Sequence, residues 1–192
     1  LTVEDLVDIA HPDRDPADVH AVALVMASEF LPVDMATEVI ILPDQRPVEP
    51  HSPEHYERTF VDPTDPSCFP GGDCPRLVTD NTIIKDYLVL SMYYEMPKAF
   101  RWVEIGEKGS GEWAILARCW QEEEYETDGG AVQLNQSYCI DIHFPRETGG
   151  ARYMVTWPET IIEGVDDDLI YETTIMGMND ILTTTEEYLA SQ

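Results

Sequence analysis

Positive charge is scarce in this sequence. Only 11 of its 192 residues are lysine or arginine, against 38 aspartates and glutamates, and the formal net charge is -27 at pH 7. Nucleic acids and anionic membranes are bound largely by neutralising their phosphates with basic side chains, and they repel a surface of this sign. The composition therefore excludes nucleic acid and anionic membranes as partners, and it predicts an acidic, well-solvated surface.

Long apolar runs are also missing. The longest apolar segment, AVALVMASEFL, spans residues 21–31, whereas a membrane-spanning helix needs about 18 or more apolar residues in succession. We therefore expect no transmembrane segment. Since 43% of the residues are hydrophobic, the chain can bury one sizeable core. We expect residues 1–192 to form a single domain.

Familiar catalytic signatures are absent too. The sequence contains no G-x-S-x-G, no P-loop and no G-x-G-x-x-G. The segment HSPEH at 51–55 matches H-x-x-E-H, but Pro53 reads as the first helical residue and leaves His51 outside the helix, so zinc is not expected there. We expect no cofactor. An incomplete calcium loop is the one weak metal candidate, formed by Asp13, Asp15 and Asp18.

The four cysteines are few but even in number, which suits disulfides in an oxidising compartment. Zinc prefers cysteine pairs two to four residues apart, and no pair here has that spacing. Cys68 and Cys74 flank a Pro-Gly-Gly turn inside a loop rich in proline. A disulfide between them would clasp a loop that is otherwise loose.

A second disulfide is predicted by the register of a hairpin. Residues 111–126 and 131–144 are strand-like runs on either side of TDGG, a strong hairpin signal. Apolar alternation then pairs Ala114 with Phe144, Leu116 with Ile142 and Trp120 with Tyr138. In that register Cys119 lies directly opposite Cys139, the alternative being two unlinked core thiols. Two disulfides in an acidic chain indicate an extracytoplasmic location, in a periplasm, at a cell surface or in the medium.

The remaining pattern divides the chain into four parts. Residues 1–42 are predicted to be helical, with helices at 2–10 and 15–30 and a candidate strand at 37–42. Residues 43–82 carry most of the prolines and are expected to form a Pro-rich clasped loop. Residues 83–158 predict an antiparallel β-meander of about five strands. The expected strands are residues 82–96, 100–105, 111–126, 131–144 and 151–157.

The fourth part, residues 166–190, predicts a long C-terminal helix. Apolar side chains recur there at alternating spacings of four and three, which places them on one face of a helix. They are Tyr171, Ile175, Met178, Leu182, Thr185 and Leu189. A curled sheet needs cover on its apolar face, and this stripe would supply it. The predicted class is α+β, with N-terminal helices, a curled meander and a long C-terminal helix.

This order of elements resembles the START and Bet v 1-like helix-grip superfamily, whose sheet wraps a terminal helix and leaves an apolar cavity between them. The resemblance covers roughly residues 83–190 and rests on the order of elements, not on a residue motif. The superfamily has one early strand before its short helices, whereas the candidate strand at 37–42 follows them. A cone-shaped fold of the polyketide-cyclase type is the alternative, although it usually ends on a strand.

The resemblance implies a ligand cavity between the sheet and the C-terminal helix. We expect it to hold a hydrophobic small molecule or lipid against adaptable Met and aromatic side chains. The expected lining is Met92, Tyr94, Trp102, Leu116, Arg118, Trp120, Tyr138, Ile140, Ile142, Met154, Met178 and Leu182. Arg118 is the charged member, and a buried arginine needs an acidic partner or an anionic ligand group. The alternative is that these side chains only fill a core.

The predicted function is therefore non-catalytic ligand binding by an exported acidic domain. Asp141 and His143 share the other face of their strand, which is expected to face solvent. Together with Arg118 they are the acid/base candidates if the chain is instead a cyclase-like or isomerase-like enzyme that uses the same cavity. The third hypothesis is a cell-surface interaction module that binds a protein partner through residues 43–82.

Overall fold

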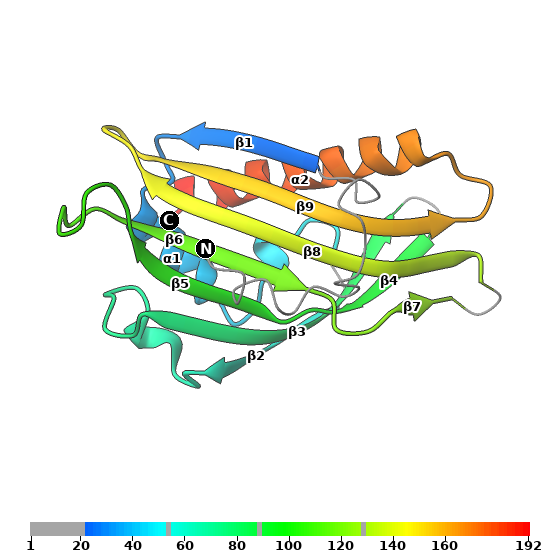
Figure 1. Cartoon of the computed structure of the whole chain (residues 1–192), viewed down its shortest axis with the longest axis horizontal. Coiled ribbons are helices and arrows are strands. Elements are labelled where there is room, and N and C mark those ends of the chain that lie inside the picture. Colours follow the sequence, from blue (N-terminus) through cyan, green and yellow to red (C-terminus); the bar gives the residue numbers. More distant parts are fainter. Residues whose placement is uncertain (1–21, 53–54, 88–89, 128–129) are drawn as a thin grey trace.

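The strands form one curled antiparallel sheet with two helices on the same side of it (Figure 1). The computed structural model describes residues 22–52, 55–87, 90–127 and 130–192. Within these ranges nine strands run in the order β1-β9-β8-β6-β5-β3-β2, with β4 paired to β3 and β7 to β8. The strands are β1 Val22–Ser28, β2 Tyr56–Asp62, β3 Arg76–Tyr87, β4 Leu90–Glu95, β5 Lys98–Glu104, β6 Trp113–Trp120, β7 Tyr125–Glu126, β8 Val132–Pro145 and β9 Gly150–Ile162. The helices are α1 Val33–Ile40 and α2 Asp167–Ala190, and two 3-10 turns are η3 Arg46–Val48 and η4 Pro66–Cys68.

The predicted α+β class is confirmed, and so is the register at its centre. Strand β6 pairs with β8 so that Leu116 lies opposite Ile142 and Trp120 opposite Tyr138. Cys119 therefore faces Cys139, and these two residues form a disulfide. The predicted clasp between residues 68 and 74 is also present. Both disulfide predictions are confirmed.

The long C-terminal helix is confirmed, and four of the six residues of its predicted stripe are buried. Asp166 caps α2 by accepting a hydrogen bond from the backbone N–H of Asp168 at 2.9 Å. The buried positions lie in the second half of the helix, at Met178, Leu182, Thr185 and Leu189. Ile175, on the same stripe, is 46% exposed. The stripe is therefore less buried in the first half of α2 than in the second.

The helix predicted at 15–30 is wrong for its described part, because residues 22–28 form the edge strand β1. This segment is apolar on both faces, so its hydrophobicity fits a strand as well as a helix. Its pairing with β9 determines that it forms a strand. The strand predicted at 37–42 is wrong too, because Val33, Ala36, Thr37 and Ile40 repeat with a helical period and are buried on one face of α1. The predicted helix at 2–10 lies outside the described residues. A strand thus precedes the short helix, in the order that the helix-grip resemblance implies.

The expected loop at 43–82 also contains regular structure. Strand β2 and the first residues of β3 lie in it and pair with each other, and the disulfide of η4 closes the connection between them. Residues 82–96, expected as one strand, instead belong to β3 and β4, which pair antiparallel. Strand β5 begins at Lys98, two residues before the strand expected at 100–105. The described prolines of this stretch all lie outside its strands, so proline content predicts irregular chain over too wide a range.

Candidate functional site

The sheet has an inner face that contacts α1 and α2 and an outer face that points away from them. On β6, Ile115 and Ala117 belong to the same buried cluster as Val33 and Ile40 of α1, so the odd-numbered side chains of β6 point inward. The pairing of β6 with β8 then places the odd-numbered side chains of β8 inward as well. Even-numbered positions of β6, and of β8 from Tyr138 onward, lie on the outer face, whereas Val132 and Leu134 lie before a bulge in β8 and point inward.

This alternation divides the predicted ligand lining into two sets of six. On the inner side lie Met92, Tyr94, Trp102, Met154, Met178 and Leu182. On the outer face lie Leu116, Arg118, Trp120, Tyr138, Ile140 and Ile142. The expectation that all twelve line one cavity is therefore wrong. Strand β6 is apolar on both faces, and on β8 the more apolar face is the outer one, while the inner face carries Asp141 and His143, so period-two alternation does not identify the face that meets the helices.

Asp141 and His143 were expected to face solvent, and the structure places both on the inner face. Arg152 of β9 donates from Nε to both carboxylate oxygens of Asp141 at 3.0 Å, and from Nη2 to Oδ2 at 2.5 Å. Its Nη1 also donates to Thr185 Oγ1 of α2 at 3.4 Å. The His143 side chain is 8% exposed, and its Nε2 lies 3.6 Å from Asp141 Oδ1. The solvent-facing expectation is therefore wrong for both residues.

Burial and charge act in opposite directions on these groups. Burial raises the pKa of Asp141, but the nearby positive charge of Arg152 and the other cations lower it by more, so this pKa lies below its ordinary value. Burial lowers the pKa of His143 to about 4, against a smaller opposite effect of Asp141. At neutral pH Asp141 is therefore a carboxylate bound by Arg152, and His143 is an uncharged imidazole.

A second carboxylate, Glu49, lies next to η3 and is also surrounded by cations. Its carboxylate oxygens are 3.5 Å from Lys85 Nζ and 3.5 Å from Lys98 Nζ, and its side chain is 10% exposed. Burial raises the pKa of Glu49, but Lys85, Lys98 and Arg152 lower it by more in total. Lys98 also donates to the hydroxyl of Tyr56 at 3.1 Å.

Arg58 is the least compensated cation of this region. Its guanidinium lies over the rings of Phe60 and Phe100, at 5.1 and 5.7 Å from their centroids, and Nη1 donates to the Leu42 carbonyl at 3.1 Å. Burial lowers its pKa to about 10. Among the described residues, its buried Nε and Nη2 have no hydrogen-bond partner.

We refer to these ionisable residues as the inner ionic cluster: Glu49, Arg58, Lys85, Lys98, Asp141, His143 and Arg152. It holds four cations and two carboxylates. The surroundings of the two carboxylates interact, because Arg152 lowers the pKa of Glu49 and Lys98 lowers the pKa of Asp141. His143 Nδ1 is buried without a partner in the described part of the chain. The sequence analysis missed this cluster, although the scarcity of lysine could have pointed to it: two of the three lysines of the chain lie here.

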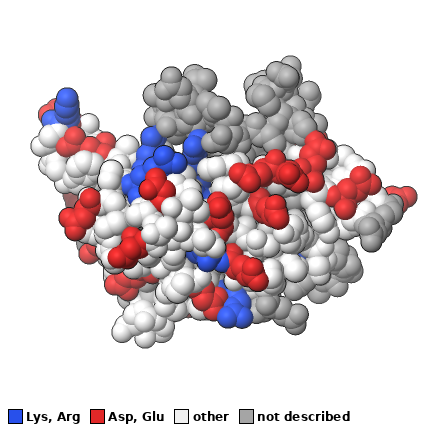
Figure 2. Space-filling view, turned by 90° about the horizontal axis from the view of Figure 1, so that it is seen from below, with Lys and Arg blue, Asp and Glu red and all other residues white. Residues whose placement is uncertain are grey.

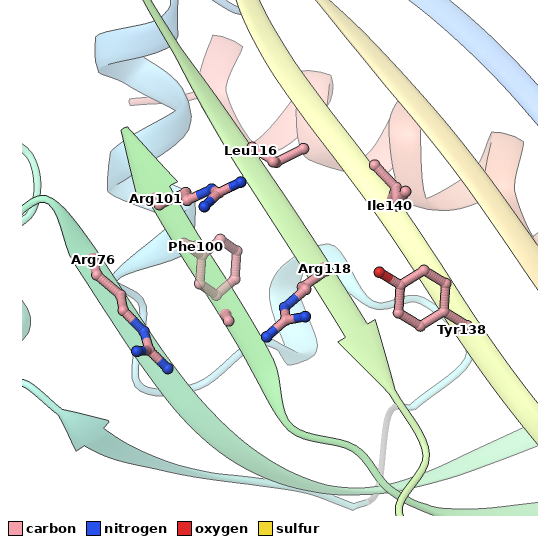
Figure 3. A pocket seen from close by; sticks show the side chains of 8 residues that line it. Arg76, Phe100, Arg101, Leu116, Arg118, Tyr138 and Ile140 are labelled. Atoms are coloured by element: carbon pink, nitrogen blue, oxygen red, sulfur yellow. The ribbon is translucent and has the colours of Figure 1, made fainter. Parts of the chain in front are cut away.

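Arg118 belongs to a different place, a pocket of about 140 Å³ on the outer face (Figure 3). Arg118 of β6 lies there with Arg76 of β3 and Arg101 of β5, above the apolar side chains of the same strands. Its guanidinium also lies 4.9 Å from the ring centroid of Trp120. On the face shown in Figure 2, the largest group of basic side chains lies in one area, a few others lie elsewhere, and acidic side chains are spread widely. The remaining lining residues are Ala99, Phe100, Leu116, Tyr138 and Ile140.

Two other expectations concern metals and membranes. In the described ranges, no group of three or more His, Cys, Asp and Glu side chains is placed to hold a metal ion. The weak calcium candidate at Asp13, Asp15 and Asp18 lies outside those ranges. None of the helices in the described part of the chain is long and apolar enough to cross a membrane.

Comparisons with known proteins give a structural likeness without a family assignment. No protein-family model and no curated protein matches the chain. The structure of TTHA0849 from Thermus thermophilus is similar with a TM-score of 0.53 and 11% identity, over 90% of this chain and 97% of that one. Ara h 8.0201 is similar with a TM-score of 0.46 and 12% identity, over 91% and 99% of the two chains. A putative uncharacterized protein from Rhizobium leguminosarum has a TM-score of 0.48 and 12% identity, over 91% and 98%. At such low identity the likeness concerns the fold alone, and the chain is a protein with the fold of TTHA0849 and the helix-grip order of elements.

Proposed function

We propose that this chain is a non-catalytic binding protein that takes up an amphipathic small molecule or lipid between the inner face of the sheet and α2. The acidic head group of the ligand would lie against the inner ionic cluster. One observation carries the proposal: a chain with a net charge of -27 holds an excess of cations in its interior. Buried cations are costly unless an anion accompanies them, so an acidic ligand group would stabilise this arrangement.

Unsatisfied polar atoms in the same region support a ligand or bound water there. Arg58 Nε and Nη2 and His143 Nδ1 are buried without a partner among the described residues. A buried donor or acceptor that lacks a partner costs about 1–3 kcal/mol, so proteins rarely leave such groups unpaired. A carboxylate or phosphate accepts hydrogen bonds from Arg58, whereas a hydroxyl of the ligand can donate one to His143.

Apolar and adaptable side chains next to the inner ionic cluster suit the rest of such a ligand. Met92, Tyr94 and Met96 form one buried cluster with Cys119 of the cross-strand disulfide. Met154 lies opposite Asp141 in the pairing of β8 with β9, and Met178 is buried on α2. Methionine adapts its shape to a partner at little cost, and a cationic site beside an apolar one matches an amphipathic molecule.

The properties of the candidate acid/base residues favour binding over catalysis. Arg118 lies on the outer face, so it does not act at one site with Asp141 and His143. A general base works best with a pKa near the working pH. The pKa of His143 is about 4, and Asp141 is held as a carboxylate by Arg152. Protein binding through residues 43–82 stays a prediction.

We include export in the proposal because both disulfides are formed. Cys119 and Cys139 lie opposite each other on paired strands, and Cys68 and Cys74 flank a turn. Disulfides persist in oxidising compartments and are rare in a reducing cytosol. The ligand would then be met in a periplasm, at a cell surface or in the medium.

A pair of fluorescent probes tests the proposed site. A dansyl-labelled long-chain fatty acid is titrated into the protein, and its methyl ester, which keeps the apolar chain and lacks the charge, is titrated in parallel. We expect saturable binding of the acid, about tenfold tighter than that of the ester, because only the acid pairs with buried cations. Absence of saturable binding for both probes, by fluorescence and by native mass spectrometry, would overturn the proposal.

Matched lysine variants locate the head group. Lys98→Gln removes one cation of the inner ionic cluster, and Lys108→Gln removes an exposed one in the β5–β6 connection. We expect Lys98→Gln to weaken binding of the acid and leave the ester unchanged, and Lys108→Gln to change neither. Equal affinity of the wild-type protein for acid and ester would remove the acidic head group from the proposal.

A further inference from the structure

The two carboxylates of the inner ionic cluster are carried by different parts of the fold. Asp141 lies in β8 and is bound by Arg152 of the neighbouring strand β9, with donor–acceptor distances of 2.5 and 3.0 Å. Glu49 lies outside the sheet, directly after η3. A carboxylate on a central strand cannot leave its position unless the sheet opens, whereas one on a loop moves with the loop at a smaller cost in free energy.

The contacts of Glu49 are also the looser ones. Its carboxylate oxygens lie 3.5 Å from Lys85 Nζ and 3.5 Å from Lys98 Nζ, whereas a strong bond between an ammonium group and a carboxylate measures about 2.7–2.9 Å. The Glu49 side chain is nevertheless only 10% exposed, so it has lost most of its contact with water. Glu49 therefore supplies negative charge to the two lysines without the short bonds that would fix it there.

The loop that carries Glu49 has backbone hydrogen bonds that close within the loop itself. We call residues 43–52 the η3 loop. Val48 donates to the carbonyl of Gln45, and Ser52 donates to the carbonyl of Glu49, both at 2.9 Å. Three residues of the loop are prolines, which have no N–H to donate to a strand. The η3 loop can therefore move as a unit without breaking the hydrogen bonds of the sheet.

The η3 loop also contacts α2 through an ion pair near the surface. His51 Nε2 lies 3.0 Å from Asp180 Oδ2, and the two side chains are 28% and 49% exposed. Exposed ion pairs of this kind contribute about 0–1 kcal/mol. This contact positions the loop over the space between α2 and the sheet, and its loss would cost little.

A carboxylate that enters this space can replace Glu49 without changing the charge of the inner ionic cluster. If Glu49 moved out alone, Lys85 and Lys98 would lose a nearby negative charge, and enclosed cations are costly without one. An acidic head group restores that charge, while the carboxylate of Glu49 regains water. A neutral head group does not.

We infer that the place of the Glu49 carboxylate, between Lys85 and Lys98, is the subsite for the acidic head group, and that the ligand displaces Glu49 from it. The inference rests on the proposed function and adds to it an internal competitor. Glu49 compensates the lysines in the empty protein, and it lowers the affinity for acidic ligands because each must displace it.

Hydrogen exchange on the wild-type protein tests the displacement. The dansyl-labelled fatty acid or its methyl ester is added to saturation, and amides of the η3 loop are followed by mass spectrometry. We expect the acid to speed exchange in this loop by about tenfold, because the displaced loop is open for longer, and the ester to have little effect. Unchanged or slower exchange with the acid bound would overturn the inference. An equal effect of acid and ester would do so as well.

A charge-removing variant tests the competition. Glu49→Gln keeps the shape of the side chain and removes its charge, and Glu57→Gln removes an exposed carboxylate on β2 as the matched control. We expect Glu49→Gln to bind the acid about tenfold more tightly than wild type does, with the ester nearly unchanged and no effect of Glu57→Gln. Unchanged or weaker binding of the acid by Glu49→Gln would mean that Glu49 does not compete with it.

Acetate tests the subsite without a long-chain ligand. Glu49→Ala should lower the melting temperature, and acetate that replaces chloride at constant ionic strength should restore about 2–4 °C of the loss. Wild type and Glu57→Ala should show no such gain, and its absence in Glu49→Ala would overturn the subsite. Restoration by acetate without binding of either probe would keep the subsite and remove the proposed function. Binding of the acid with no effect of Glu49→Gln would keep the function and remove this inference.

Discussion

At the scale of single residues, the inner face shows how a buried charge is tolerated. Asp141 is 14% exposed and Arg152 is 11% exposed in their side chains, and each compensates the other through a bidentate contact. Removing one partner of such a pair typically costs about 3–5 kcal/mol, because the other charge stays buried alone. His143 lies beside this pair and stays neutral, because burial outweighs the attraction of Asp141 for its proton.

His143 should make the free energy of unfolding depend on pH. In the unfolded chain it takes up a proton near pH 6.5, whereas in the folded protein it resists protonation down to about pH 4. The unfolded state therefore binds more protons between these values, so stability falls as pH is lowered from about 6.5 to about 4 and changes little from this source outside that range. The full loss is about 3 kcal/mol.

Urea unfolding of wild type and His143→Gln across this range checks the prediction. The difference in unfolding free energy between the two proteins should shrink or change sign as pH falls, because the variant carries no titrating group at this position. His55→Gln, at a half-exposed histidine before β2, serves as the control. Parallel pH profiles of wild type and His143→Gln would contradict a buried neutral His143.

At the scale of elements, the burial of α2 differs along its length. Leu182 is fully buried, whereas Ile175 and Met176 are 46% and 57% exposed. Near its C-terminal end α2 also contacts β1, where Ser28 Oγ donates to Glu186 at 2.7 Å. The second half of α2 is therefore a structural part of the core. The first half presents apolar side chains to solvent.

Alanine substitutions in the two halves should separate these roles. Leu182→Ala removes a fully buried side chain and is expected to lower the unfolding free energy by about 2–5 kcal/mol. Ile175→Ala, on the same stripe but half-exposed, should change it by less than about 1 kcal/mol. Chemical denaturation measures both. A similar large loss for Ile175→Ala would mean that the first half of α2 is covered in solution, for example by a second copy of the chain.

At the scale of the whole molecule, acidic and basic residues are distributed differently. Acidic residues spread over the surface, whereas four of the 11 basic residues lie in the inner ionic cluster and three line the outer pocket. Acidic surface charge keeps such a protein soluble, and it does not neutralise the cations enclosed by the sheet. The two basic sites lie on opposite faces of the same sheet and are therefore chemically separate.

The two disulfides should both be present in protein purified without reductant. The denatured mass is then about four daltons below that of the reduced chain, as export to an oxidising compartment requires. The Cys119 and Cys139 bridge spans 20 residues and the Cys68 and Cys74 bridge spans 6. By loop entropy their removal as Cys→Ala pairs should cost about 3 and about 2 kcal/mol. A full reduced mass for the protein isolated from its own source would argue against export.

Much of the fold could be predicted from short-range pattern. The pairing of β6 with β8, both disulfides and the length of α2 follow from alternation, cysteine spacing and a 3.6-residue period. The N-terminal order was predicted wrongly because residues 22–28 are apolar throughout, and their choice of strand depends on the free edge of β9. No local feature of the segment reports such an edge.

The candidate site could likewise be predicted only in part from the sequence. Sequence by itself determined that the protein is acidic, that its cysteines match in pairs and that a long amphipathic helix follows an antiparallel sheet, because these properties lie within single segments or adjacent ones. Only the tertiary structure decided which face of the sheet is inside. It placed Asp141 and His143 in the interior and Leu116 and Arg118 outside, because the inner side of a strand is fixed by the helix that packs on it and not by which of its faces is the more apolar.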